Sequence, residues 1–341
     1  MSRQRILTIL TAIFFLGSAD LIGCASGTAG DGSVTTKIDE KPGFTWSRLT
    51  ESADFPKSYN FPVFVVNGKV YAMLGYGVWF SENGSDWQKT PLEPVRKNVY
   101  TGQYVQFRNA VYMLGDHDGN YERIRFSPKI RRTNEMKEWE TLSERSNLPG
   151  RIFPGIVVFC DRIWVIGGYD GQYHRNDVWS SADGVEWRLE TERAAWSPRV
   201  SMGLIVFNDR LWLFGGGVID GMADHNPGST SEIWSTTDGR SWTKSDTQLP
   251  AMAGGTPVVF ENELWLVGAN RDGVFGRASL VTPDMRTWRE EPAPWSPRGG
   301  VAAWTHNGSL FMTGGKYSYT DAGNVKFVYS NDVWMMKKKP R

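Results

Sequence analysis

Three arginines recur at equivalent positions of three similar phrases, LPGRIFPG, WSPRVSMG and WSPRGGVAA: they are Arg151, Arg199 and Arg298. The guanidinium group offers a rigid fork of donors that pairs bidentately with a carboxylate. Three such groups gathered near one point would hold an acidic sugar, an acidic peptide or another anion, so we take them as candidate ligand-binding residues. An alternative stays open, because each arginine would equally serve a repeated scaffold by bonding backbone carbonyls and stacking on a Trp.

Tyrosines and histidines lie in a second set of segments, which includes YDGQYHRND with Tyr169 and His174. Flat rings stack on sugar faces or anchor a protein partner, so these two residues join the candidate ligand-binding set. Neutral imidazoles beside carboxylates also bind zinc or copper, which makes His117, His174 and His225 weak metal candidates. The sequence has no close ligand spacing such as HxxxH, so we expect surface histidines, no bound metal and no cofactor.

The elements that must position these residues are repeats. A phrase with an apolar strand, a polar turn, an aromatic strand and a glycine occurs six times, for example VVNGKVYAMLG, VFCDRIWVIGG and VFNDRLWLFGG. Its glycines are separated by 40, 52, 48, 53 and 46 residues. Periods of this size indicate a solenoid, propeller or array.

A second phrase follows the first after a loop, and its clear copies are GVWFSENGSDW, DVWSSADGVEW and EIWSTTDGRSW. The Asn-Gly and Asp-Gly pairs in these copies stand between two strands, where we expect them to supply the positive φ angles of a tight hairpin. Each unit is thus four antiparallel strands with aromatic residues on both faces. Such sheets bury their faces by packing against one another around a channel, which predicts a β-propeller.

The spacing of tryptophans gives the number of blades. In the clear copies the outer-strand Trp follows the third-strand Trp by eight residues, as at Trp79 and Trp87. In the last unit the third-strand Trp is Trp334, so its outer partner would fall just beyond position 341, whereas Trp46 lies in an outer-type strand with no inner strands before it. We therefore predict one all-β domain over residues 44–341, a six-bladed propeller closed by the N-terminal strand.

One face of this propeller is expected to carry the variable loops. The segments from strand two to strand three and from strand four to the next blade leave on the same side. They include the long GVIDGMADHNPGSTSE and KYSYTDAGNVKFVYSND segments, and tyrosines at 76, 173, 317 and 319. Long loops on a rigid scaffold are where binding is usually found.

The repeated phrases resemble kelch repeats, and residues 44–341 are similar to the propeller superfamily that includes the central domain of galactose oxidase. Paired glycines at 167/168, 215/216 and 314/315 and the spaced tryptophans carry this resemblance. It implies a kelch-type propeller. It does not imply the oxidase's copper chemistry, because no Tyr, His and Cys ligand set falls on one face. Some kelch propellers handle sialic acid, and the resemblance to them favours an acidic sugar as the ligand of the three arginines.

The first residues have the layout of an export signal. Arg3 and Arg5 precede an apolar run from Ile6 to Leu16, and the segment ends in Leu-Ile-Gly-Cys at Cys24, which resembles the bacterial lipobox. We expect residues 1–23 to be removed, Cys24 to be lipidated and residues 24–43, which are small and polar, to form a flexible tether. The location predicted by these features is the bacterial cell envelope, outside the cytoplasm.

The near-equal charges, 38 basic and 37 acidic residues, disfavour nucleic acid as a partner. Our leading hypothesis is a monomeric, non-catalytic propeller, anchored to the membrane by lipid, that binds a protein or carbohydrate ligand through its loop face. The ligands covered by this hypothesis include acidic ones. The alternative is an enzyme on acidic sugars that resembles a sialic-acid mutarotase, with one of the three arginines holding the carboxylate. The sequence identifies no acid/base pair for it.

Overall fold

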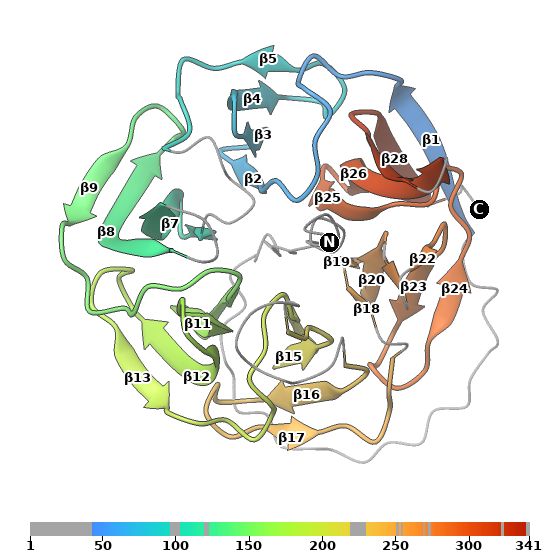
Figure 1. The fold of residues 1–341 in the computed structure, drawn as a ribbon. Coiled ribbons are helices and arrows are strands. Elements are labelled where there is room, and N and C mark those ends of the chain that lie inside the picture. The colour runs from blue at the N-terminus through green and yellow to red at the C-terminus, as the bar shows by residue number, and fades with distance from the viewer. Residues whose placement is uncertain are drawn as a thin grey trace.

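The computed structural model describes residues 43–95, 103–118, 123–218, 230–249, 252–253, 255–268, 270–271, 274–321 and 324–338. These residues form strands and turns, and among them no helix is long and apolar enough to cross a bilayer. The export signal, Cys24, nearly all of the tether and His225 lie outside the described residues. Figure 1 shows six sheets arranged as blades around a central axis.

Blades 1 to 3 each have four antiparallel strands in chain order, from the axis outward. Blade 1 consists of β2 (Val63–Val66), β3 (Lys69–Leu74), β4 (Gly77–Ser81) and β5 (Gln88–Lys89). Blade 2 consists of β6 (Tyr104–Phe107), β7 (Ala110–Asp118), β8 (Arg125–Asn134) and β9 (Glu140–Ser143). Blade 3 consists of β10 (Gly155–Phe159), β11 (Arg162–Tyr169), β12 (His174–Ser181) and β13 (Arg188–Thr191).

Blades 4 and 5 repeat this order. Blade 4 consists of β14 (Gly203–Phe207), β15 (Arg210–Phe214), β16 (Ile233–Thr236) and β17 (Thr243–Lys244). Blade 5 consists of β19 (Thr256–Phe260), β20 (Glu263–Val267), β23 (Ser279–Thr282) and β24 (Arg289–Glu291). A small separate sheet joins β18 (Met252–Ala253), β21 (Asn270–Arg271) and β22 (Val274–Phe275).

Blade 6 is built from both ends of the described chain, as the tryptophan spacing predicts. It contains β25 (Gly299–His306), β26 (Ser309–Asp321) and β28 (Val333–Lys338), and its outermost strand is β1 (Phe44–Thr50). β1 pairs with β28 in antiparallel register, with Trp46 opposite Met336 (Figure 1). The far end of β26 pairs with β27 (Asn324–Tyr329). The predicted six-bladed propeller closed by its N-terminal strand is confirmed.

The turns between the first and second strands of the blades hold two successive residues with positive φ in five blades. This backbone matches the twist of a two-residue hairpin. The pairs are Asn67/Gly68, Cys160/Asp161, Asn208/Asp209, Glu261/Asn262 and Asn307/Gly308.

The Asp-Gly turns between the third and fourth strands differ from their prediction. In blade 3, Gly184 has a φ of 79°, but Asp183 does not have a positive φ. Oδ1 of Asp183 instead accepts the backbone N–H groups of Val185 and Glu186 at 2.8 and 3.0 Å, and the hydroxyl of Ser181 accepts the N–H of Gly184 at 2.8 Å. The expectation of positive φ at both residues is therefore wrong. Blade 5 builds the same turn from Thr282, Asp284 and Met285 although its sequence departs from the repeat.

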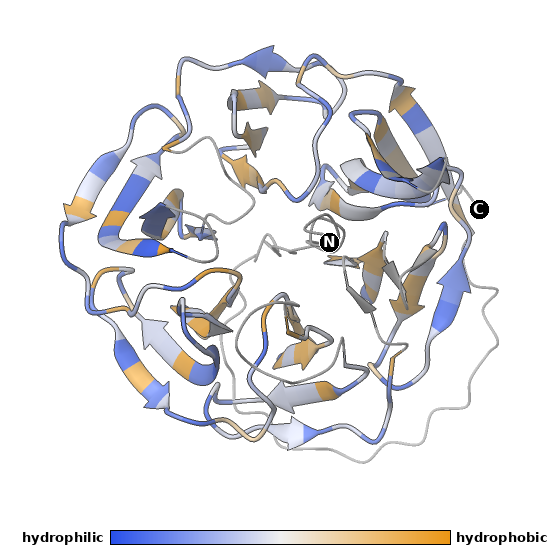
Figure 2. Cartoon of the chain, viewed as in Figure 1, coloured by the Kyte–Doolittle hydropathy of each residue, from blue (hydrophilic) through white to orange (hydrophobic). Residues whose placement is uncertain are grey.

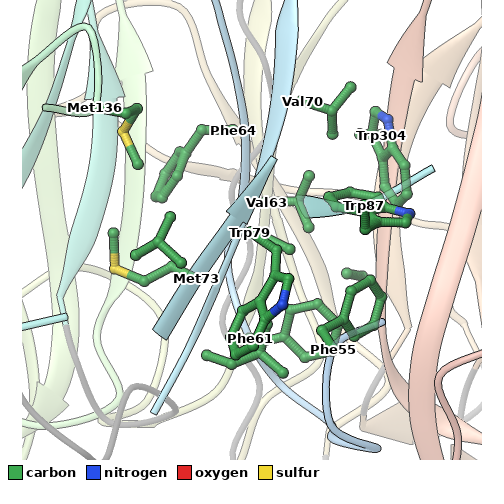
Figure 3. Close-up of a cluster of buried hydrophobic side chains, with 14 of the residues drawn as sticks. Phe55, Phe61, Val63, Phe64, Val70, Met73, Trp79, Trp87, Met136 and Trp304 are labelled. Carbon is green, nitrogen blue, oxygen red and sulfur yellow. The ribbon is translucent and has the colours of Figure 1, made fainter. Parts of the chain in front are cut away.

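The glycine of this turn also lets neighbouring blades approach. A Cβ on Gly184 would lie 2.7 Å from the ring of Tyr112 in blade 2, and one on Gly84 would lie 2.5 Å from Phe311 in blade 6. The hydrophobic core lies between the sheets, and Figure 3 shows the part of it around blade 1, where Phe55 packs against Trp87 with ring centroids 5.1 Å apart. The outermost strands are predominantly hydrophilic (Figure 2).

Candidate functional site: the loop face

The loop face is the side of the propeller where second strands lead to third strands and fourth strands lead to the next blade. All three candidate arginines lie under this face, shortly before an innermost strand. Arg151 and Arg199 stand four residues before the strand begins, and Arg298 stands directly before it. Their side chains are buried, with 1%, 1% and 3% of the residue exposed at Arg151, Arg199 and Arg298. The donors of these guanidiniums are directed into the blades.

In blade 3, Arg151 is held by partners of its own sheet. Its Nη1 donates to the carbonyl of Gly167 at 2.8 Å, and its Nη1 and Nη2 donate to the two carboxylate oxygens of Asp177 at 2.7 and 3.0 Å. The indole of Trp179 donates to the same carboxylate at 2.7 Å. We call this set of arginine, carboxylate and tryptophan an arginine clasp. It ties the segment before the first strand to the second and third strands.

Blades 4 and 6 contain the same clasp. The arginine donates to a glycine carbonyl sixteen residues further along in all three blades. Its carboxylate partner stands two residues before the third-strand tryptophan, whose indole donates to that carboxylate. The sets are Arg199, Gly215, Glu232 and Trp234 in blade 4, and Arg298, Gly314, Asp332 and Trp334 in blade 6.

The blade 4 clasp is joined by a lysine. Glu232 accepts from Arg199 at 2.8 Å and from Lys244 at 2.6 Å. Burial by itself would raise the pKa of Glu232, but the hydrogen bonds from Lys244, Arg199 and Trp234 together lower it to about 2. The carboxylate is therefore ionised over the whole physiological range.

The arginines are thus bound blade by blade, and no side-chain contact among the described residues brings two of them together. This geometry supports the scaffold role that the sequence left open, while a role in binding a ligand stays a prediction. The sequence carried a signal for the clasp, because DVW, EIW and DVW occur in the same three units as the arginines. Blade 1 has Gly77 at the place of the carboxylate and Ser58 at the place of the arginine.

Tyr169 and His174 do come together. They are opposite each other at the end of the β11–β12 pair, with ring centroids 5.2 Å apart, and both are buried, at 4% and 3% exposed. Tyr169 belongs to a small apolar cluster under the loop face with Ile152, Phe153 and Val200. The expectation of a surface histidine is therefore wrong for His174.

The metal candidates do not form a site in the part of the chain that the structure describes. His117 lies on β7 near Phe126, with ring centroids 6.2 Å apart. Among the described residues no group of three His, Cys, Asp or Glu side chains is placed to hold a metal ion. His225 lies outside those residues.

The loop face exposes tyrosines. Of the six large hydrophobic side chains that are exposed among the described residues, four are tyrosines on this face: Tyr76 (72%), Tyr173 (44%), Tyr319 (48%) and Tyr329 (36%). They come from blades 1, 3 and 6. Tyr329 was not among the sequence candidates, although it stands within the long KYSYTDAGNVKFVYSND segment of blade 6.

The β26–β27 pair adds a buried cation that was not among the residues predicted from the sequence. The ammonium of Lys316 lies 4.2 Å from the ring centroid of Tyr59 and 4.7 Å from that of Phe327. Burial lowers the pKa of Lys316 to about 8. Tyr59 also packs on Tyr329, with centroids 5.4 Å apart, so an aromatic cluster joins blade 6 to the segment that leads into blade 1.

Two hollows lie away from this face. One is at the outer rim between β1 and the β4–β5 turn, and the other is beside the β8–β9 turn of blade 2. Neither is lined by a candidate arginine, by Tyr169 or by His174.

No curated protein matches the chain. The solved structure of YjhT is similar, with a TM-score of 0.63 and 14% sequence identity over 84% of this chain and 96% of that one. At this identity the likeness shows the fold alone. A family model for the DUF6242 beta propeller domain matches residues 24–335, which is most of the chain, so the protein belongs to the DUF6242 beta propeller family.

Proposed function

We propose that this protein is a kelch-type binding propeller, held at the bacterial envelope by lipid on Cys24, whose loop face binds a protein or glycan ligand. The observation that carries the proposal is the set of four exposed tyrosines on that face, at positions 76, 173, 319 and 329. Tyrosine supplies a large, rigid contact surface with a polar end, which suits sugar faces and protein partners alike.

The support beneath these tyrosines favours binding. The clasps of blades 3, 4 and 6 fix the segments from which the loops rise, and the cluster around Tyr169 fills the space under the loops of blade 3. Loops held by a rigid scaffold lose less conformational entropy when a ligand binds. The loop face is therefore suited to hold a ligand without a large rearrangement.

An enzyme that acts on acidic sugars finds less support. Such an enzyme needs cationic donors for the substrate carboxylate, and the three arginines already donate to Asp177, Glu232 and Asp332. A substrate would have to displace a buried ion pair, which is costly. Binding without catalysis is the function we propose.

The loop-face proposal is tested with a variant in which all four exposed tyrosines are replaced by alanine. Its matched control is Leu189→Ala, since Leu189 is 42% exposed but lies on the outer strand β13. Glycan arrays and cross-linking to envelope proteins are compared with those of the unmodified protein. We expect the tyrosine variant to lose about tenfold or more in affinity. Its melting temperature should fall only through loss of the Tyr59–Tyr329 contact, which a single Tyr329→Ala variant measures separately. Equal binding by the tyrosine variant would contradict the proposal.

The anchor is tested separately. A Cys24→Ser variant, expressed with a labelled fatty acid, should lose both the label and its sedimentation with membranes. Cys160 is the one other cysteine of the chain. A Cys24–Cys160 disulfide on a non-reducing gel, with no incorporated lipid, would overturn the anchor while leaving the loop-face proposal in place.

A further inference from the structure

β1 enters the propeller at a defined side of the ring. The side opposite the loop face, which we call the turn face, consists of the turns between first and second strands and between third and fourth strands. Figure 1 shows β1 at the outer rim, where it completes blade 6. The end of β1 that lies at the turn face decides where the chain from Cys24 reaches the domain.

The register of blade 6 places the beginning of β1 at the turn face. β26 begins at Ser309, directly after a two-residue turn, and runs toward the loop face. β28 is antiparallel to β26, and β1 is antiparallel to β28, so β28 ends and β1 begins at the turn face. Phe44, the first residue of β1, accordingly pairs with Lys338, the last residue of β28.

Contacts with blade 5 fix the same corner. The ring of Phe44 lies 5.7 Å from that of Phe260, which directly precedes the β19–β20 turn. The ammonium of Lys338 lies 2.8 Å from the carboxylate of Glu261, the first residue of that turn. The start of β1 is therefore held at the turn face of two neighbouring blades.

The two faces are far apart on the scale of the expected tether. β26 extends from the turn face toward the tip of the loop face over 13 residues, or about 40 Å at the rise of an extended strand. Residues 24–43, which their composition predicts to be a flexible tether, would have a root-mean-square length of about 25 Å. A lipid on Cys24 therefore stays closer to the turn face than to the loop face in most arrangements of such a tether.

The chemistry of the turn face agrees with a position near lipid headgroups. Lys337 is exposed beside the start of β1 and makes no ion pair with a described residue. Basic side chains are attracted to anionic headgroups. The two-residue turns also keep this side free of long loops in five blades. Exposed tyrosines suit a lipid interface as well, so a loop face that lies on the membrane is the alternative that the experiment must separate.

We propose that the turn face lies against the headgroups of the membrane that carries Cys24, and that the loop face is presented away from it. This orientation rests on the lipid anchor proposed above. The four exposed tyrosines then meet molecules that approach from outside that membrane. The ligand of the loop face is therefore not a headgroup of the lipids around the anchor.

The test places a fluorescent label on either face of the full acylated chain. The vesicles contain phosphatidylethanolamine, phosphatidylglycerol and a lipid with a spin-labelled headgroup. In a Cys160→Ser background, Arg286→Cys serves the turn face of blade 5 and Thr320→Cys the loop face of blade 6, since both side chains are exposed. We expect quenching at position 286 to be at least about twofold stronger than at position 320. Equal quenching, or stronger quenching at position 320, would overturn the orientation.

A longer tether is the matched control. About forty Gly and Ser residues inserted after Gly43 would raise its root-mean-square length to about 45 Å, comparable to the height of the blade, so the difference in quenching should shrink. An unchanged difference would refute the tether as its cause. Quenching at neither position, in a protein without the acyl label, would remove the anchor and the orientation together. Loop-face binding is measured separately with the four-tyrosine variant, and its failure would leave the orientation in place.

Discussion

Blades 1 and 3 share a sequence frame but differ in how they are fixed. Their third-strand tryptophans, Trp79 and Trp179, pair with the fourth strand in the same register. Blade 3 has an arginine clasp and Asn147, whose carboxamide bonds the backbone of the outer-strand tryptophan, whereas blade 1 has Gly77 in place of the clasp carboxylate and Asp54 in place of the asparagine. Repeats of one fold are therefore fixed by different contacts, since blade 3 uses an arginine clasp and an asparagine where blade 1 has neither.

The largest effect is expected when the arginine clasp of blade 3 is removed. Arg151→Ala leaves Asp177 without its buried cation and should lower the free energy of unfolding by about 3–5 kcal/mol. Ser58→Ala, at the equivalent place in blade 1, should change it by less than about 0.5 kcal/mol. Urea unfolding of both variants measures the contrast. An Arg151→Ala protein as stable as the unmodified one would mean that the clasp does not stabilise blade 3.

A second contrast separates backbone strain from packing. Gly184 and Gly68 have φ values of 79° and 73°, but a Cβ on Gly184 would meet Tyr112 whereas one on Gly68 would meet nothing within 4 Å. Gly68→Ala should cost about 1 kcal/mol from backbone strain, and Gly184→Ala about 2–3 kcal/mol because Tyr112 must also move. Thermal unfolding of the pair is the measurement. Equal losses would show that the turn glycine is needed for its φ alone.

The third contrast is a pH dependence that comes from the blade 4 clasp. The folded pKa of Glu232, about 2, lies below its ordinary value of 4.5, so the stability it contributes is present above pH 4.5 and lost as the pH falls toward 2. The expected loss is about 2 kcal/mol once partial exposure is allowed for. Blade 1 has Gly77 at this position and contributes no such term. Acid unfolding of Glu232→Gln should lack this part of the slope, and an unchanged slope would assign it to other carboxylates.

The sequence predicted the ring because its signals are local and repeated. Trp79 and Trp87 stand eight residues apart within one hairpin, and Trp46 and Trp334 complement each other at the ends of the domain. The site depends on pairings between distant residues. Arg151 meets Asp177 only when the blade has folded. The sequence alone therefore suggested an arginine available to a ligand, whereas in the protein its side chain is buried against that carboxylate. The acid two residues before the tryptophan was readable, but its link to the arginine required the fold.

The pairing of β1 with β28 has a consequence for the order of events in the cell. A chain that is synthesised from its N-terminus presents β1 first and the residues opposite it last, since Phe44 pairs with Lys338. Until then β1 is a solitary strand with two open edges, and long-range pairing of this kind is slow. The ring therefore completes only after residues 333–338 can pair with β1, and an exposed strand edge persists until then.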